Sequence, residues 1–461
     1  MVWVGNASQN GRYYGASGVR LALCMLPCKE RMYQTDLSVR LQDPKVAPGV
    51  LGVEPNVWKL GFTSLFTDVS AEMISSILPL YFVVYLGFSP LQFGVLDGIY
   101  QGAAVASLSL VAGIAADRWR RQKEVAIGGY AFSAISKLGL LMVGGSWTIA
   151  AIVIGLDRVG KSIRTAPRDA MISLSSKSST MATAFAVHRA LDTGGSVLGP
   201  VIAFALLEIA PGGFTFILLT SFCIALIGVG LITLLVDKPQ AATEPGQPAP
   251  SIRLALGLWM DPAFRTIMLA GGILALMTAS DAFIYLVVQK NTGCSTTAFP
   301  LFALITAVAY LLLAVPLGKL ADAWGRRKVF LGGFVFVLMV YVILLMPGLG
   351  KGVQFASVGL LGAYYAATNG VLAAVASSAL APNLRTSGLA FLNTVLGACK
   401  LVSSVLFGLL WTTGAMKTPV WVFSLGLMAA FVISGWILND KQIRWSDCKG
   451  CFGCKRCGKR Y

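Results

Sequence analysis

The sequence predicts an all-α integral membrane protein whose twelve transmembrane helices form two pseudo-symmetric bundles of six. Its 461 residues are 56% hydrophobic and only 12% charged, and the mean hydropathy is +0.73. Soluble domains are far less apolar than this. The apolar residues gather into runs of about 20 residues, which is long enough for a helix to cross the hydrocarbon core of a bilayer. A charged segment that occurs twice, 205 residues apart, indicates an internal duplication.

The apolar runs define the spans and the parts of the chain between them. Spans are expected at about 58–85, 91–114, 124–144, 147–168, 180–208, 213–236, 264–289, 297–320, 328–347, 354–380, 387–411 and 418–438. The N-terminal bundle then covers 58–236 and the C-terminal bundle 263–438, with a Pro- and Ala-rich cytoplasmic linker at 237–262. A short interfacial helix is expected in this linker near Leu254–Met260.

The chain ends are expected to lie outside the bundles. Residues 1–57 form a disordered extension, or a wrongly assigned start with Met32 as the true initiator, and residues 439–461 form a basic, cysteine-rich tail. The formal net charge of +17 does not indicate nucleic-acid binding, because the basic residues lie between the apolar runs. With the N-terminus inside, the outer loops hold only Lys290, Lys351 and Lys417 as bases, so both termini are expected in the cytoplasm and the protein in the plasma (inner) membrane.

The repeated segment predicts a conformational latch. Its second copy runs Gly318-Lys-Leu-Ala-Asp-Ala-Trp-Gly-Arg-Arg-Lys328, and a weaker copy runs from Gly113 to Lys123. The glycines are expected to allow close helix contact, and each aspartate to accept hydrogen bonds from a facing helix N-terminus. Contacts of the arginines that form in one conformation and break in another would make the loop bistable. The latch residues are Gly113, Asp117, Arg118 and Arg121 in the first copy and Gly318, Asp322, Gly325 and Arg326 in the second.

The pattern G-x-x-x-D-(R/K)-x-G-R-R/K of these loops closely resembles the signature loop of the major facilitator superfamily. The resemblance covers about residues 58–438. It implies a secondary transporter, not an enzyme, that moves a small solute by alternating access and needs no cofactor.

Charged residues inside the first and fourth spans are candidates for proton coupling, because an ionisable group in a membrane is costly. Ser64, Asp68 and Glu72 recur every four residues and share one helix face. Two acids so close repel each other, so one of them can gain and lose a proton near pH 7; alternatively, they only hold helices together. Arg158 resembles the buried arginine of the superfamily's fourth-helix motif, which implies a coupling role. Lys161, Arg164 and Arg168 are alternatively positive-inside anchors, the interpretation we favour for Arg168.

The fifth span carries the only histidine of the chain and a glycine-proline motif. His188 and Asp192 are expected to form a hydrogen-bonded pair that titrates near neutral pH, although a lone histidine is often structural. Gly195, Gly199 and Pro200 predict close packing and a helix kink. They resemble the G-x-x-x-G-P motif associated with antiporters of the superfamily. The glycine pair that usually follows is replaced by Ala203 and Phe204.

Other polar residues within spans are expected to line a central cavity. They are Asp97, Gln101, Asp281, Tyr285, Tyr364, Asn369, Asn393 and Lys400. Asp281 and Lys400 are the most costly to bury, and they are better tolerated if they face water or each other.

The tail contains Cys448, Cys451, Cys454 and Cys457 at regular C-x-x-C spacing. Four thiolates in a reducing compartment are candidate zinc ligands. An unstructured basic tail that meets anionic lipid, or is acylated there, is the alternative.

Three functions remain open, two of them forms of transport and one from another class. The first is proton-coupled efflux of a drug, an organic solute or a metal complex. The second is proton-coupled uptake of a small organic anion, since several basic residues face the expected cavity. The third is a non-transporting receptor or metal sensor that uses the cysteine tail. The expected partners are a small solute, protons and the lipid bilayer, and no nucleic acid.

Overall fold

The computed structural model describes residues 53–102, 121–176, 180–238, 257–380 and 385–438. Every regular element in these ranges is helical, which confirms the predicted all-α membrane fold. Ten helical segments of the described residues are long and apolar enough to cross a membrane. Two expected spans are not among these ten. The span at 91–114 runs beyond the described residues, and the span at 147–168 lies in a 28-residue helix that carries six charged side chains.

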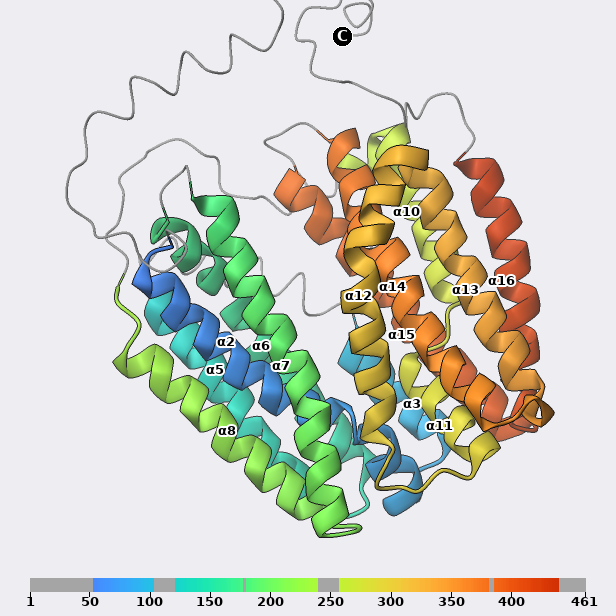
Figure 1. The fold of residues 1–461 in the computed structure, drawn as a ribbon, viewed down its shortest axis with the longest axis horizontal. Helices are drawn as coiled ribbons and strands as arrows, with labels where there is room; N and C mark the ends of the chain where they lie inside the picture. The colour runs from blue at the N-terminus through green and yellow to red at the C-terminus, as the bar shows by residue number, and fades with distance from the viewer. Residues whose placement is uncertain (1–52, 103–120, 177–179, 239–256, 381–384, 439–461) are drawn as a thin grey trace, which may run out of the picture. The chain divides into compact units, whose positions relative to one another are not determined.

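The helices α2, α5, α6, α7 and α8 of the first half pack in one group, whereas α3 lies among helices of the second half (Figure 1). α2 contacts α7 and α8, whereas α5 contacts α6 and α8. The elements are α2 (Pro55–Ser75), the π-helix η2 (Leu80–Tyr85), α3 (Pro90–Gln101), α5 (Gln122–Gly139), α6 (Trp147–Leu174), α7 (Met181–Ile209) and α8 (Phe214–Leu234). A 3-10 turn, η3 (Leu140–Met142), follows α5.

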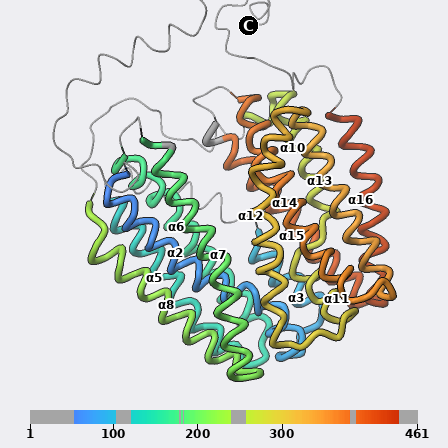
Figure 2. The backbone as a smooth tube through the Cα atoms, in the orientation of Figure 1, coloured from blue at the N-terminus to red at the C-terminus, as the bar shows by residue number. Residues whose placement is uncertain are grey.

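The helices of the second half pack around α14 (Figure 2). α14 contacts α12 and α13, and α16 contacts α10 and α13. The elements are η4 (Leu258–Met260), α10 (Pro262–Leu276), α11 (Asp281–Thr292), α12 (Pro300–Trp324), α13 (Arg326–Leu345), η5 (Pro347–Leu349), α14 (Lys351–Ala379), α15 (Arg385–Thr413) and α16 (Lys417–Ile437). Of the interfacial helix expected near Leu254–Met260, the described part is the 3-10 turn η4. Between the halves, α3 packs along α15 and α7 contacts α12.

Two spans that were expected to be continuous are interrupted. The first changes from α2 to the π-helix η2, and the seventh is divided between α10 and α11. Free backbone groups at such a break need partners in an apolar surrounding. The Tyr341 hydroxyl supplies two of them, because it accepts from the amide of Ala279 at 2.7 Å and donates to the carbonyl of Met277 at 3.2 Å. Ser280 caps the start of α11 by accepting from the amide of Ala282 at 3.3 Å.

The glycines of the G-x-x-x-G-P motif bring α7 against the backbone of α2. A Cβ atom added at Gly195 would lie 2.8 Å from the carbonyl oxygen of Leu65 and 2.9 Å from Cβ of Asp68. A Cβ atom at Gly199 would lie 2.7 Å from Cβ of Glu72. The two acids of α2 therefore sit where α7 approaches most closely. α7 continues as one helix through Pro200.

The latch loop differs from the expectation in its described part. Gly325 has φ +101° and separates α12 from α13, in agreement with a tight turn. Asp322, near the end of α12, meets the side chain of Arg326 at the start of α13 at 3.4 Å, and within the described ranges it accepts from no backbone amide of a facing helix. Gly318 is not a close contact point, because a Cβ atom there would meet nothing within 4 Å. Arg121 is exposed before α5, and Gly113, Asp117 and Arg118 lie outside the described residues.

Replacement of Gly199 by alanine tests the contact between α2 and α7. The added methyl group meets Glu72 and the backbone of Val69, so we expect Gly199→Ala to lower the free energy of unfolding by about 1–3 kcal/mol. The measurement is the unfolding temperature of the purified protein in detergent. Gly230→Ala in α8 is the matched control, because its methyl group enters open space. Equal unfolding temperatures for the two variants would contradict the proposed packing.

Candidate functional site

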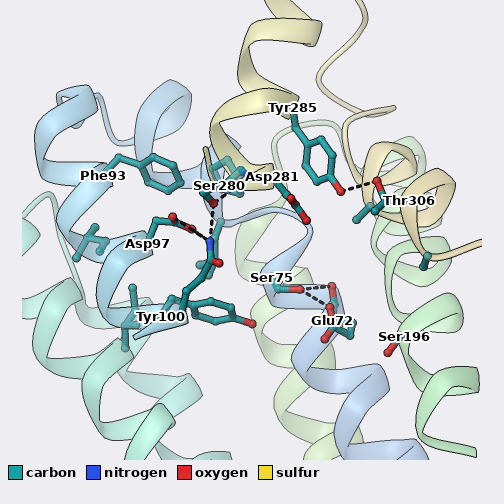
Figure 3. Close-up of a pocket in the computed structure, with 18 of the residues that line it drawn as sticks. Glu72, Ser75, Phe93, Asp97, Tyr100, Ser196, Ser280, Asp281, Tyr285 and Thr306 are labelled. Carbon is teal, nitrogen blue, oxygen red and sulfur yellow. Dashed lines mark hydrogen bonds between the residues drawn. The ribbon is translucent and has the colours of Figure 1, made fainter. Parts of the chain in front are cut away.

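A cavity of about 490 Å³ is lined by helices of both halves (Figure 3). α2, α3 and α6 provide one part of its wall, and α11, α12 and α14 provide another. In Figure 3, Glu72 of α2 and Asp281 of α11 extend from different helices toward the same space. Of the cavity residues predicted from the sequence, the structure places Asp97, Gln101, Asp281, Tyr285 and Asn369 in this wall, together with Glu72 and Arg158.

The second half contributes one carboxylate among aromatic residues. Asp281 is the first residue of α11, and its carboxylate accepts a hydrogen bond of 2.7 Å from the Tyr365 hydroxyl. Tyr285 lies one turn further along α11 and donates to Thr306 of α12 at 2.8 Å. These hydroxyl bonds fix the aromatic rings in the wall. Thr306 was not predicted, because its partner Tyr285 comes from another helix.

A chain of hydrogen bonds joins the two halves at α3. The buried carboxylate of Asp97 accepts from Ser404 of α15 at 2.5 Å and from Gln101 at 3.1 Å. The same amide nitrogen of Gln101 donates to Ser280, at the break of the seventh span, at 2.6 Å. Asp97 is thus held by neutral donors, which is one way to satisfy a buried polar group.

The first half contributes cations to the cavity wall. Arg158 is buried, forms an ion pair with Asp157, and places its guanidinium carbon 3.9 Å from the centre of the Tyr100 ring. Lys161 lies one turn further along α6 and is half-buried in the same wall. Glu72 accepts a hydrogen bond of 2.6 Å from Ser75. The expected network of Asp68, Glu72 and Arg158 is therefore divided, because Arg158 finds its counter-ion on its own helix.

A second cluster of charges lies beside the cavity, one turn away from Glu72 on α2. Asp68 meets the buried guanidinium of Arg164 at 3.5 Å. This guanidinium stacks 4.6 Å from the ring centre of Tyr130, and its Nε and Nη1 atoms have no hydrogen-bond partner among the described residues. Asp192 of α7 brings a second carboxyl group within hydrogen-bonding range of Asp68. We call Asp68, Arg164, Arg168 and Asp192 the carboxyl-pair cluster.

Two predictions about this cluster are wrong in their partners. His188 does not pair with Asp192; its Nε2 atom lies 2.9 Å from the Ser64 hydroxyl, because the ring faces α2. Arg168 is not simply an anchor in a cytoplasmic loop. Its guanidinium lies 3.0 Å from Asp169 and 3.9 Å from Asp192, and it is largely buried. The helix extends to Leu174, beyond the expected end at 168, and so keeps Arg168 inside the bundle.

The remaining predicted cavity residues line a second cavity of about 370 Å³. It includes Tyr364, Asn393 and Lys400, and it shares Gln101 and Asn369 with the first cavity. Lys400 is close enough to Asp281 and Asp97 to interact with their charges, but no ion pair joins them among the described residues. Of the two arrangements that the sequence left open, the structure therefore shows both residues lining cavities rather than joined in an ion pair.

A buried lysine of α5 was missed in the sequence. Lys137 is 3% exposed, donates to the Ser70 hydroxyl, and lies in electrostatic range of Asp157. Asp157 also accepts from Ser133 at 2.6 Å. The signal was present, since Lys137 is a charge in the middle of the apolar run 124–144. The four tail cysteines lie outside the described residues, within which no group of three or more possible metal ligands occurs.

Comparison with known proteins gives a family and a fold. Residues 60–309 match the family model of the Major Facilitator Superfamily. The chain is 29% identical over 394 residues to an uncharacterized MFS-type transporter of Methanocaldococcus jannaschii, a match that covers 83% of this chain and 94% of that protein. It is 27% identical over 389 residues to an uncharacterized protein of Mycobacterium tuberculosis, covering 80% of this chain and 90% of that protein.

Solved structures with the same fold are transporters. The nucleoside transporter NupG superposes with a TM-score of 0.69 at 16% identity, covering 84% of this chain and all of that one. A D-xylose-proton symporter superposes with a TM-score of 0.62 at 16% identity, covering 82% of this chain and 96% of that one. Identities this low show the fold alone, but the family model spans more than half of the sequence. The chain belongs to the major facilitator superfamily.

Proposed function

We propose that this protein is a proton-coupled secondary transporter that exports a small organic solute through the cavity between its halves. Family and fold support secondary transport, and they point to a transporter rather than to an enzyme. They do not favour a receptor or metal sensor. The coupling ion, the direction and the site residues are inferences from the contacts that follow. The distribution of basic residues among the loops supports a cytoplasmic position for both termini.

The pair of carboxyl groups in the carboxyl-pair cluster is the observation that supports proton coupling. Asp68 and Asp192 lie within hydrogen-bonding range, and a hydrogen bond between two carboxyl groups requires a proton on one of them. Two negative charges at this distance would repel in a surrounding of low polarity. Arg164 and Arg168 stabilise the charge that remains. The cluster can thus hold one proton and release it when the helices separate.

The cluster is placed to sense the contents of the cavity. Asp68 and Glu72 are one turn apart on α2, and Glu72 lines the cavity. Lys161 lies in electrostatic range of both acids. A solute that changes the surroundings of Glu72 or Lys161 therefore changes the field at Asp68, and this coupling acts in both directions.

The packing of α7 favours export over uptake. The motif that resembles the G-x-x-x-G-P motif of antiporters places Gly195 against Asp68 and Gly199 against Glu72. Any change in the angle between α7 and α2 must move both acids. The basic residues Arg158 and Lys161 in the cavity keep proton-coupled uptake of an organic anion as the second candidate.

Arg158 is held by a group of buried charges behind the cavity. Asp157 binds it on one side and lies in electrostatic range of Lys137 on the other. Burial of ions is costly unless each has partners, and removal of one partner leaves the others uncompensated. Lys137 is therefore a positioning residue for Arg158 through Asp157.

Proton coupling is tested by neutralising each member of the carboxyl pair. We expect Asp68→Asn and Asp192→Asn to reduce solute-driven proton flux by about 5- to 150-fold, the range of typical coupling free energies. Proton flux is measured by a pH dye inside proteoliposomes during a screen of organic cations, zwitterions and anions. Glu208→Gln is the matched control, because Glu208 is an exposed acid near the end of the same helix as Asp192.

Exchange of labelled solute without a pH gradient provides the reference in these experiments. It should persist in Asp68→Asn and Asp192→Asn, because exchange needs the cavity but no net proton movement. Accumulation driven by an acidic interior indicates antiport, whereas accumulation driven by an acidic exterior indicates uptake with protons. Undiminished proton flux in both variants would exclude the carboxyl pair as the coupling site.

The role of Lys137 leads to a prediction about stability. Lys137→Met is expected to lower the free energy of unfolding by about 3 kcal/mol, because Asp157 loses a buried counter-charge. Lys238→Met is the control: Lys238 forms an exposed ion pair of 2.6 Å with Glu124, and its loss should cost less than about 1 kcal/mol. Unfolding temperatures in detergent measure both effects. A smaller effect at Lys137 than at Lys238 would show that the buried charges do not depend on one another.

A further inference from the structure

We propose that the cavity binds a zwitterionic aromatic solute, with its anionic group at Arg158 and Lys161 and its amine at Asp281. This inference rests on the proposed function only in taking the cavity as the solute site. It does not depend on protons as the coupling ion. Three features of the cavity wall support it: a cationic side, an anionic side and aromatic rings between them.

The cationic side belongs to α6. Arg158 and Lys161 both line the cavity, whereas Glu72 is the carboxylate that lies in electrostatic range of both. The ammonium group of Lys161 makes no hydrogen bond or ion pair within the described residues. A cation in this position lacks a direct acceptor. A carboxylate or phosphate of a solute would supply it with charge-assisted hydrogen bonds.

The anionic side belongs to α11 of the other half. Asp281 accepts one hydrogen bond from Tyr365, and no cation lies within ion-pair distance of it in the described part of the chain. A carboxylate can accept several hydrogen bonds, so acceptor capacity remains. An amine bound there would also lie among the aromatic residues Tyr285 and Tyr365, which line the same cavity.

The space between the two charged sides suits the aromatic ring of a solute. Its aromatic lining consists of Phe82, Phe93, Tyr100, Tyr285, Tyr310 and Tyr365. The volume of about 490 Å³ is typical of pockets for small organic ligands. Because the two charged sides belong to different halves, a solute with charges at opposite ends contacts both halves at once. A solute with a single charge makes a charged contact with only one half of the protein.

A matched panel of small molecules tests the proposal. The probe is 4-(aminomethyl)benzoate, which carries an amine and a carboxylate at opposite ends of a ring. Its methyl ester keeps only the amine, and its N-acetyl derivative keeps only the carboxylate. Dissociation constants are measured by calorimetry on the purified full chain in detergent. We expect the zwitterion to bind at least about tenfold more tightly than either derivative, since each charged contact is worth roughly that factor.

Two variants assign each charge to its side of the cavity. Asp281→Asn should weaken zwitterion binding to the level of the N-acetyl derivative and leave binding of that derivative unchanged. Lys161→Gln should weaken it to the level of the ester and leave the ester unchanged. The unchanged derivative in each case shows that the variant is folded. Glu124→Gln is the control, because Glu124 pairs with the exposed Lys238 away from the cavity.

The outcomes separate this proposal from the proposed function. Binding in detergent involves no gradient, so zwitterion selectivity without solute-driven proton flux would support this proposal and oppose proton coupling. Proton flux driven only by solutes that carry a single charge, without selectivity for the zwitterion, would support proton coupling and oppose this proposal. Equal or tighter binding of either derivative, or binding of no member of the panel, would overturn the assignment of a zwitterion to the cavity.

Discussion

The burial of the charged residues of α6 is the constraint on which the first half of the protein depends. Six charged side chains lie between Asp157 and Asp169 of this helix. Each would cost several kcal/mol in a membrane without partners. The neighbouring helices provide partners for the three arginines: Tyr100 of α3 for Arg158, Asp68 of α2 and Tyr130 of α5 for Arg164, and Asp192 of α7 for Arg168. The packing of α2, α3, α5 and α7 against α6 therefore depends on how these helices compensate the charges of α6.

This constraint also explains how the site is divided. The charges of α6 nearer its start face the cavity or lie behind it, whereas Arg164 and Arg168 meet the acids of α2 and α7. α2 belongs to both groups, because Glu72 lines the cavity and Asp68 binds Arg164. A single helix therefore links the place where a solute would bind with the place where a proton would be held. No long pathway between the two is needed.

The sequence was sufficient for the fold class and for several residues that line the two cavities, because both depend on local patterns. Apolar runs reveal spans, and charges inside them reveal costly positions such as Asp68, Arg158 and Asp281. The contact partners of these side chains could not be predicted from the sequence. Whether Arg158 meets Asp157 or Glu72, and whether His188 meets Asp192 or Ser64, depends on helix rotation and crossing angles that no periodicity contains. The break before Asp281 was missed for a related reason, since Tyr341, which satisfies it, lies about 60 residues away in sequence and on another helix.

The break between α10 and α11 divides the seventh span into two helices that can change their angle to each other. α10 packs mainly on α15 and α16, whereas α11 packs mainly on α14, which α10 also touches, so the two arms differ in their main neighbours. At the junction of α10 and α11, the Tyr341 hydroxyl forms hydrogen bonds with the backbone groups of Met277 and Ala279. A rigid rod would carry any tilt at Asp281 along its whole length. A break held at Tyr341 would confine bending to a few residues, so that α11 could tilt at the cavity without moving α10 where it packs on α16.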